Sequence, residues 1–284
     1  LLAITLTEIA SYLVWFEIIE PFRYATVENP TPFMSHISYN PILAFTIYIV
    51  LHEIFFNKKL SNLIFSFYSF FAISMTINMF ITQGRAGQVA FFVVLSILIF
   101  QILDKQRIKS LITIFIIIPG IFFTAFMISD LFQQRVNIAI TEALDYSNPG
   151  TTSSVGLRIN YAINSWDVIK ENPIIGVGTG DFPIEYKKIN QINTPKFPKT
   201  TNPHNMYTLI TVQLGLIGLF SMLSIFYYQL KLSFNSSNKL IRNVGITLPL
   251  MFLVLMWSDS YILGHYTTLM FVFFSSFLYK DFDK

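Results

Sequence analysis

Long apolar runs dominate this sequence and constrain its fold more than any other feature. A helix needs about 20 mostly apolar residues to cross the hydrocarbon core of a membrane. The runs are continuously apolar and do not alternate between polar and apolar residues, which excludes a membrane β-barrel. The sequence therefore predicts an all-α, polytopic membrane helix bundle with about eight spans. The eight candidate spans are Leu1–Ile19, Ile42–Phe56, Leu60–Thr82, Ala86–Leu103, Leu111–Ile128, Met206–Leu230, Val244–Leu263 and Tyr266–Tyr279.

The scarcity of charged residues supports a membrane protein. Charged residues make up 12% of the chain and hydrophobic residues 53%, whereas soluble domains carry about 25% charged residues. This composition excludes a soluble globular protein and a disordered chain. The chain contains no Cys, which excludes a disulfide-rich scaffold, a thiol enzyme and a Cys-ligated metal site. A net charge of +3 is too small to indicate a nucleic-acid partner.

The distribution of Lys and Arg predicts the orientation of the spans. Ten of these residues fall in loops on one side, while the short loops on the other side hold only Arg23 and Arg85. Cytoplasmic loops are enriched in Lys and Arg, so we place the N-terminus in the cytoplasm and the long loop on the outer side. We divide the chain into five N-terminal spans (1–128), an outer loop carrying short helices (129–205) and three C-terminal spans (206–284). Because the chain begins at Leu1 without a Met, we expect that it starts partway through a longer membrane protein.

One segment of the outer loop has a clear helical pattern. Apolar residues recur at helical spacing through Gly156–Asn172, with Ser153 and Ser154 as candidate N-caps and Pro173 as the stop. This amphipathic helix could lie along the membrane interface or pack on the bundle. Arg158 falls in its first turn, where the helix dipole disfavours a cation. That position indicates either a nearby anion or an exposed site that tolerates the charge.

Two further segments follow in the loop. Pro173–Phe182 carries three alternating glycines, which permit a tight turn or a close approach of two backbones. It is not a dinucleotide-binding fingerprint, because no strand-and-helix pattern surrounds it. Glu185–Pro203 is rich in Pro and Lys, which is typical of a solvated loop and would also attract an anionic lipid headgroup.

Three residues near the outer ends of the spans are candidates for chemistry. His204 directly precedes the run that begins at Met206. Histidine titrates near neutral pH, so His204 is either a general base, which Asn205 could orient, or a structural residue. Arg85 lies in the TQGRAG sequence between the third and fourth runs. Its guanidinium offers a planar fork of donors that suits phosphate oxygens, and the alternative is that it marks the membrane interface.

The predicted topology places Arg85, Arg158 and His204 on the same outer face. Two fixed cations beside a titratable base suit a reaction at a diphosphate leaving group. The cations would stabilise the charge that develops on the diphosphate, and the base would deprotonate an incoming hydroxyl. Asp259 and His265 lie near the outer end of the seventh run, where they could line the acceptor side or form structural contacts.

The order of these features resembles the O-antigen ligase and polymerase superfamily of bacterial membrane glycosyltransferases. The resemblance covers about Ile42 to Phe274. It rests on an Arg motif at a short outer turn, then a long outer loop, then an apolar helix. The Gly before Arg85 departs from the Ser-Arg-Gly order that is frequent in the family. The matching motifs are TQGRAG (82–87), Arg158-x7-Trp166, NPIIGVGTGDF (172–182), His204-Asn205 and QLGLIGL (213–219).

The resemblance implies transfer of a glycan from undecaprenyl diphosphate to an acceptor hydroxyl at the periplasmic face of the bacterial inner membrane. Ligases of the superfamily use a lipid A–core sugar as acceptor, polymerases use another lipid-linked glycan, and related oligosaccharyltransferases use a protein Ser or Thr. By position, Arg85 and Arg158 resemble the diphosphate-binding arginines and His204 the general base. Asn205 and Asp181 are further candidate substrate-binding residues.

The resemblance also implies a metal-independent enzyme without a cofactor. The sequence agrees, since it offers no His and carboxylates clustered at the spacing of metal ligands. Family members commonly have more spans than the eight predicted here, so the resemblance implies that some N-terminal spans are missing.

Two other functions compete with glycosyl transfer. A transporter or flippase of anionic lipid-linked substrates would usually place charged or broken-helix sites near the membrane midplane, often in two matching halves. This sequence shows polar groups at the outer edge and no matching halves. A membrane scaffold with an outer interaction loop is the third interpretation. Substitution of His204 separates the three, because only the transferase requires it.

Overall fold

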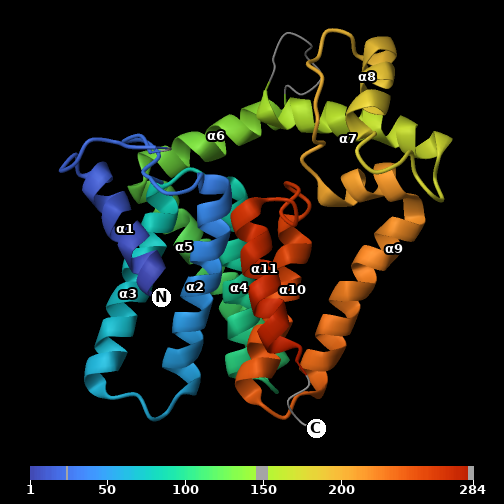
Figure 1. Cartoon of the computed structure of the whole chain (residues 1–284). Helices are drawn as coiled ribbons and strands as arrows, with labels where there is room; N and C mark the ends of the chain where they lie inside the picture. Colours follow the sequence, from blue (N-terminus) through green and yellow to red (C-terminus); the bar gives the residue numbers. More distant parts are fainter. Residues whose placement is uncertain (24, 145–152, 281–284) are drawn as a thin grey trace. The chain divides into compact units, whose positions relative to one another are not determined.

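The computed structural model describes residues 1–23, 25–144 and 153–280, and among these it forms helices and no β-strand (Figure 1). The chain divides into two compact units, Leu1–Arg135 and Val136–Lys284, and the boundary falls within α6. The helices are α1 Leu2–Trp15, α2 His36–Phe56, α3 Asn62–Ile81, α4 Arg85–Leu103, α5 Arg107–Ile128, α6 Asp130–Leu144, α7 Ser154–Glu171, α8 Phe182–Asn193, α9 Met206–Asn235, α10 Lys239–Leu255 and α11 His265–Leu278.

Each of the predicted apolar runs coincides with one of these helices. Five helices, α2, α3, α4, α5 and α9, are long and apolar enough to cross a membrane. The remaining three, α1, α10 and α11, contain 14, 17 and 14 residues. The prediction of an all-helical membrane bundle is therefore confirmed, while the count of eight spans and the division at residues 128 and 205 stay predictions.

In the first unit, α2 is central and packs against both α3 and α4. A buried polar contact ties these helices to α1, because Asn78 of α3 reaches two neighbours. Its Nδ2 donates to Ser11 Oγ of α1 at 2.9 Å, and its Oδ1 accepts from the Tyr39 hydroxyl of α2 at 2.9 Å. All three side chains are fully buried. Interhelical hydrogen bonds of this kind are a main source of helix association inside a membrane.

We expect Asn78→Ala to lower the free energy of unfolding by about 1–3 kcal/mol, because it leaves two buried hydroxyls without their partner. Thermal unfolding in detergent micelles measures this loss. Asn57→Ala, at an exposed position in the loop between α2 and α3, is the matched control, and a change within about 0.5 kcal/mol is expected for it. Equal losses for the two variants would contradict the role given to Asn78.

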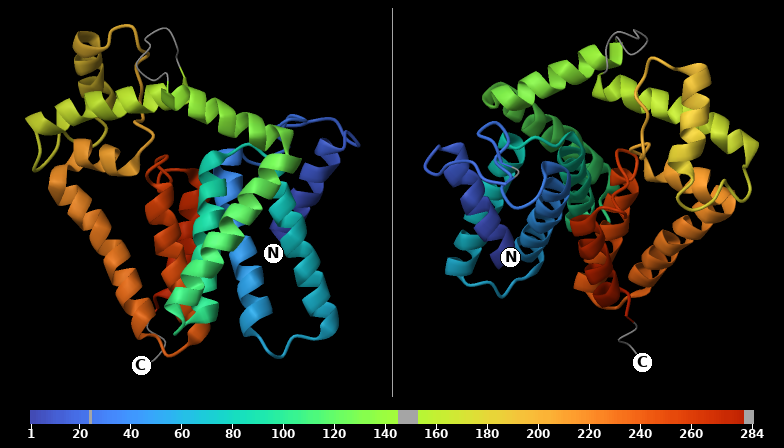
Figure 2. Two further views of the ribbon diagram at one scale, coloured as in Figure 1. Left: turned by 180° about the vertical axis from the view of Figure 1, so that it is seen from behind. Right: turned by 45° about the horizontal axis from the view of Figure 1, so that its top comes forward.

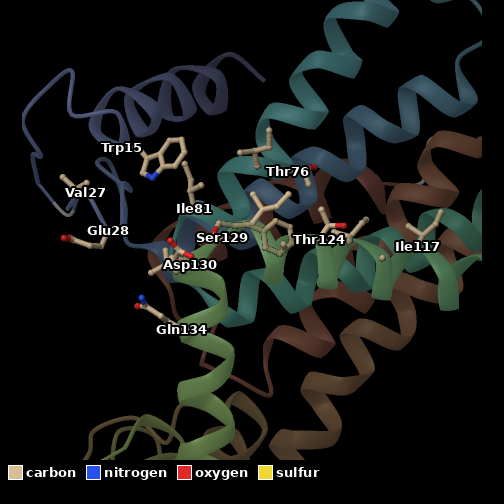
Figure 3. Close-up of a pocket in the computed structure, with 17 residues that line it drawn as sticks. Trp15, Val27, Glu28, Thr76, Ile81, Ile117, Thr124, Ser129, Asp130 and Gln134 are labelled. Carbon is tan, nitrogen blue, oxygen red and sulfur yellow. The ribbon is translucent and has the colours of Figure 1, made fainter.

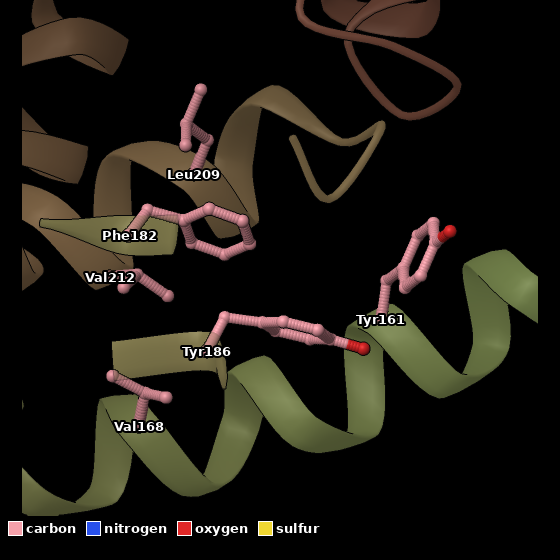
Figure 4. Close-up of a cluster of buried hydrophobic side chains, with 6 residues drawn as sticks. All are labelled: Tyr161, Val168, Phe182, Tyr186, Leu209 and Val212. Atoms are coloured by element: carbon pink, nitrogen blue, oxygen red, sulfur yellow. The ribbon is translucent and has the colours of Figure 1, made fainter. Parts of the chain in front are cut away.

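In the second unit, α7, α8 and the first turns of α9 pack around one apolar cluster (Figure 4). The predicted helix at 156–172 is confirmed as α7, which begins after Ser153, since the Ser153 Oγ accepts from the Gly156 N–H at 3.0 Å. Serine is among the preferred N-cap residues because it satisfies one otherwise free N–H group. The cluster consists of Tyr161, Val168, Phe182, Tyr186, Leu209 and Val212.

The predicted solvated loop at 185–203 is only partly correct. Its first half belongs to α8, which the sequence pattern did not predict. Pro183 lies at the start of this helix, where its missing N–H costs nothing, and Glu185 lies in the first turn, where a negative charge suits the helix dipole. The other prolines of the segment follow after Asn193, so they do not interrupt the helix. The helix α6 was also not predicted; residues 145–152 that follow it lie outside the described residues.

Candidate functional site

The helix α9 contains a break at Gly215, where φ is 63° and ψ is −162°. The sequence predicted one continuous span here, and the bend is visible in Figure 1 and from two further directions in Figure 2. In an unbroken helix, the N–H of Leu216 would bond to the carbonyl of Val212, and the N–H of Ile217 to that of Gln213. The break frees these four backbone groups from each other. Unpaired backbone groups are costly near a membrane, so each needs a new partner.

The segment Pro173–Gly180, which we call the glycine turn, supplies all four partners. Its backbone forms hydrogen bonds with the N–H and carbonyl groups that are left unpaired in α9. The bonds run from Val177 N–H to the Val212 carbonyl (2.9 Å), from Gly178 N–H to the Gln213 carbonyl (3.0 Å), from Leu216 N–H to the Pro173 carbonyl (2.9 Å) and from Ile217 N–H to the Ile174 carbonyl (3.2 Å).

Two glycines permit this close approach. A Cβ added at Gly215 would lie 2.2 Å from the backbone of Ile174, and one added at Gly176 would lie 2.4 Å from the backbone of Gln213. Both glycines also have positive φ, which L residues with a side chain rarely adopt. The sequence predicted that the three glycines permit either a tight turn or a close approach of two backbones. The structure contains both features in this segment. This contact fixes the first turns of α9, which follow directly after His204.

His204 has an unusual backbone conformation, with φ at 52°. Positive φ costs an L residue roughly 1–2 kcal/mol, so neighbouring contacts must hold it. Asn202 Oδ1 accepts from the His204 N–H at 2.9 Å. On the other side, Asn205 caps α9, because its Oδ1 accepts from the Thr208 N–H at 3.0 Å. Strained residues of this kind are concentrated at functional sites.

The side chain of His204 pairs with Asp259, which lies in the segment that follows α10. Their Nδ1 and Oδ2 atoms are 3.2 Å apart, and the side chains are 39% and 16% exposed. The run predicted to end at Leu263 ends as a helix at Leu255, which places Asp259 outside the helix. His204 is therefore accessible on one side and held on the other by a carboxylate.

The electrostatic surroundings keep Asp259 ionised. Burial alone would raise the pKa of this carboxyl, but hydrogen bonds from His204 and from the Ser260 N–H, together with the charges of His204 and Arg158, lower it below the ordinary value. An ionised carboxylate can only accept a hydrogen bond. In the neutral imidazole, Nδ1 therefore carries the hydrogen and Nε2 keeps its lone pair for a proton from another molecule.

The helix α7 supplies two further groups on one face. Tyr161 stacks on the imidazole of His204, with ring centroids 6.2 Å apart and planes inclined by 26°. Arg158 precedes it by three residues, which is the spacing of side-chain neighbours on a helix. Its positive charge contributes to the lowered pKa of Asp259, although less than the hydrogen bonds from His204 and from the Ser260 N–H. The second unit thus brings Arg158, His204 and Asp259 together.

Arg85 lies in the first unit, where it is the first residue of α4. Asn40 of α2 holds the preceding turn, because its Nδ2 donates to the Gln83 carbonyl at 2.9 Å and its Oδ1 accepts from the Thr82 hydroxyl at 2.9 Å. A Cβ at Gly84 would lie 2.6 Å from Asn40 Nδ2. Asn40 therefore leaves no space for a side chain at the position before Arg85. The position of Arg85 beside the groups of the second unit stays a prediction.

The three other predicted site residues, Asn205, His265 and Asp181, lie in different local environments. Asn205 donates from Nδ2 to the Trp257 carbonyl at 3.2 Å in addition to capping α9. His265 is exposed at the start of α11, where its ring contacts that of Tyr266. Asp181 lies at the start of α8 beside the glycine turn. No group of three or more His, Asp or Glu side chains among the described residues could hold a metal ion.

Sequence reasoning missed Asn202 and Tyr161. Asn202 orders the site, because its Oδ1 also accepts from the Ser260 hydroxyl at 2.9 Å, while its Nδ2 lies 3.4 Å from Asp259 Oδ1. An Asn before a Pro commonly bonds to the backbone two residues on, and that local signal could have identified it. Tyr161 lies on the predicted amphipathic helix, but nothing in the sequence pairs it with His204.

These features define a multi-pass membrane protein with a polar site at the end of a broken helix. The family model described as O-antigen ligase matches residues 70–223, more than half of the chain, and includes the turn before Arg85, the helix α7, the glycine turn and His204. The chain therefore belongs to the O-antigen ligase family. It is also similar to an uncharacterised protein of Haemophilus influenzae, with 29% identity over 236 residues, which cover 77% of this chain and 58% of that protein. The chain thus spans less than two thirds of the length of this relative.

We expect Gly215→Ala to separate the glycine turn from α9 and to lower the unfolding temperature, because the new methyl group would overlap the backbone of Ile174. Gly180→Ala is the matched control. It also has positive φ, but an added Cβ meets nothing within 4 Å, so its loss should be limited to about 1–2 kcal/mol from the backbone conformation. Thermal unfolding of both variants in micelles measures the difference. A loss at Gly215 no larger than at Gly180 would argue against the docked turn.

Proposed function

We propose that this protein transfers a glycan from undecaprenyl diphosphate to an acceptor hydroxyl at the periplasmic face of the bacterial inner membrane. The acceptor is the lipid A–core, which makes the reaction a step of lipopolysaccharide biosynthesis. Membership of the O-antigen ligase family supports a lipid-linked glycan donor and a glycan acceptor. The proposal uses no cofactor and no metal, because His204 and two arginines supply the required proton and charge chemistry.

The pairing of His204 with Asp259 carries the proposal. In the transfer step, the acceptor oxygen attacks the anomeric carbon of the glycan and forms the new glycosidic bond. The bond from that carbon to the phosphate oxygen breaks, and undecaprenyl diphosphate leaves with the electron pair. The acceptor proton passes to His204 Nε2, while Asp259 stabilises the resulting imidazolium through Nδ1 at 3.2 Å. The same orienting role of a carboxylate is known from catalytic Ser-His-Asp sites.

The arginines act on the diphosphate in this proposal. Arg158 lies on α7 within the electrostatic environment of Asp259, so its charge is available where the leaving group develops negative charge. Arg85 is proposed to bind the same diphosphate from the start of α4, where the N-terminal end of the helix also favours an anion. Asn205, Asp181 and His265 are retained as candidate contacts to the glycan or acceptor.

Other acceptors and other reactions remain as alternatives that experiment can separate. A polymerase would use a second lipid-linked glycan, and a protein oligosaccharyltransferase would use a Ser or Thr hydroxyl; both would employ the same His204 chemistry. Transport of anionic lipid-linked substrates ranks below these. The His204–Asp259 pair holds a base in position for a proton, and a transporter would need this arrangement only if transport were coupled to protons.

The test follows release of undecaprenyl diphosphate from a lipid-linked oligosaccharide by the full-length protein in liposomes. We expect release to depend on an acceptor. His204→Ala and Asp259→Asn should each lower kcat by about 100- to 10,000-fold, because they remove the base or its orientation. Arg158→Ala and Arg85→Ala should lower kcat/KM by about 100-fold through weaker charge stabilisation.

The controls are Asp167→Asn and Lys188→Ala, which remove surface charges of α7 and α8 that pair locally with Lys170 and Glu185. Both should keep release near the wild-type rate. Release that survives His204→Ala in a folded protein would rule out the proposed base. Acceptor-independent movement of the donor across the bilayer, without cleavage, would support transport instead.

A further inference from the structure

The first unit contains an apolar groove that the proposed reaction does not use (Figure 3). Its volume is about 930 Å³, within the range of small-molecule sites. It is bounded by the end of α1, the loop that follows, the last turns of α3, and the stretch from α5 into α6. The apolar lining includes Trp15, Ile77, Phe80, Ile117, Gly120 and Ile128.

The length of the groove matches one leaflet of a membrane. Along α5 its lining extends from Ile117 to Ile128, a distance of about 16 Å at 1.5 Å per residue. Half of a hydrocarbon core about 30 Å thick is about 15 Å. The side of α5 that does not pack against α4 is exposed, and Ser110 is the sole buried residue of this helix among those described. The apolar part of the groove therefore has the depth of the hydrocarbon chains of one leaflet.

Polar side chains gather at one end of the groove, where α5 gives way to α6. Glu28, Ser129, Asp130 and Gln134 line this end, as Figure 3 shows. It lies at the same end of the unit as the turn before Arg85, since the Ser129 hydroxyl donates to the Phe80 carbonyl near the end of α3 at 3.0 Å. Both carboxylates are exposed, and neither forms an ion pair with any residue in the described parts of the chain.

We propose that this groove binds a phospholipid of the outer leaflet whose headgroup carries an ammonium, such as phosphatidylethanolamine. Its acyl chains would occupy the apolar trough, and its ammonium would lie beside Glu28 and Asp130. Two carboxylates at the mouth disfavour a lipid diphosphate, because like charges repel. This assigns the groove to a membrane lipid and not to the donor of the proposed reaction. The inference does not depend on that reaction.

Gly120 offers a direct way to close the groove. It lines the groove on α5, and a Cβ added there meets nothing within 4 Å. A large side chain at this position has room at its Cβ and would occupy part of the trough. Phe123 lies on the same helix with 61% of its surface exposed, and it is not part of the lining. It therefore provides a matched position for a control substitution.

Native mass spectrometry of the full-length protein tests the proposal. The protein is extracted in detergent and exposed to equal amounts of phosphatidylethanolamine and phosphatidylglycerol. We expect wild type to retain phosphatidylethanolamine with about two- to fivefold preference, since exposed ion pairs are individually weak. Gly120→Trp should lose the bound lipid, Gly120→Leu should weaken it, and Phe123→Trp should bind as wild type.

The headgroup is tested by the double variant Glu28→Gln, Asp130→Asn, which should still bind lipid but without preference between the two headgroups. Equal binding of both lipids to wild type, or unchanged binding to Gly120→Trp, would overturn the proposal. Undecaprenyl diphosphate is added as a competitor. Its displacement of phosphatidylethanolamine from wild type at equal concentration would assign the groove to the donor and would also overturn the proposal.

Discussion

The exchange of backbone hydrogen bonds at Gly215 is the constraint on which the arrangement of α7, α8 and the start of α9 depends. A helix that is broken beside a membrane must have its free backbone groups paired. The glycine turn pairs all four of them, and it can do so because two glycines allow the backbones to meet. The broken helix is therefore a docking site for a loop that comes from far earlier in the chain. This contact and the apolar cluster that includes Leu209 and Val212 together fix the direction of the first turns of α9.

That direction matters because His204 immediately precedes α9. Asn202 and Asn205 fix its backbone on both sides, and Asp259 fixes its ring. Asn202 and Asn205 flank His204 in the chain, whereas Asp259 comes from the segment after α10, so the position of the imidazole is determined by packing as well as by sequence. Arg158 contributes charge to the same place and favours the ionised form of Asp259. The result is a base with a defined tautomer at an accessible position, which is the physical basis of the proposed transfer reaction.

The sequence predicts some of these features and leaves others open for physical reasons. The hydrophobic runs predict the apolar helices, because a helix that crosses a membrane needs about 20 mostly apolar residues. Ser153 marks the start of α7, because its side chain accepts a local hydrogen bond from the backbone. The break at Gly215 is invisible to the same reasoning, since Leu214 and Leu216 continue the apolar run. The pairing of His204 with Asp259 joins residues 55 positions apart, and only the tertiary fold decides that contact. Asp259 was among the candidate residues, but its contact with His204 was not predicted.

The central claim of the proposed function is that His204, held by Asp259, takes the proton of the acceptor hydroxyl. Free imidazole can act as the base when a variant lacks the histidine side chain and leaves space in its place. We would measure acceptor-dependent release of undecaprenyl diphosphate by His204→Gly with and without added imidazole, and compare it with Arg158→Ala as control. The account predicts that imidazole restores part of the release by His204→Gly and leaves that of Arg158→Ala unchanged. Release by a folded His204→Gly at the wild-type rate without imidazole would contradict the account.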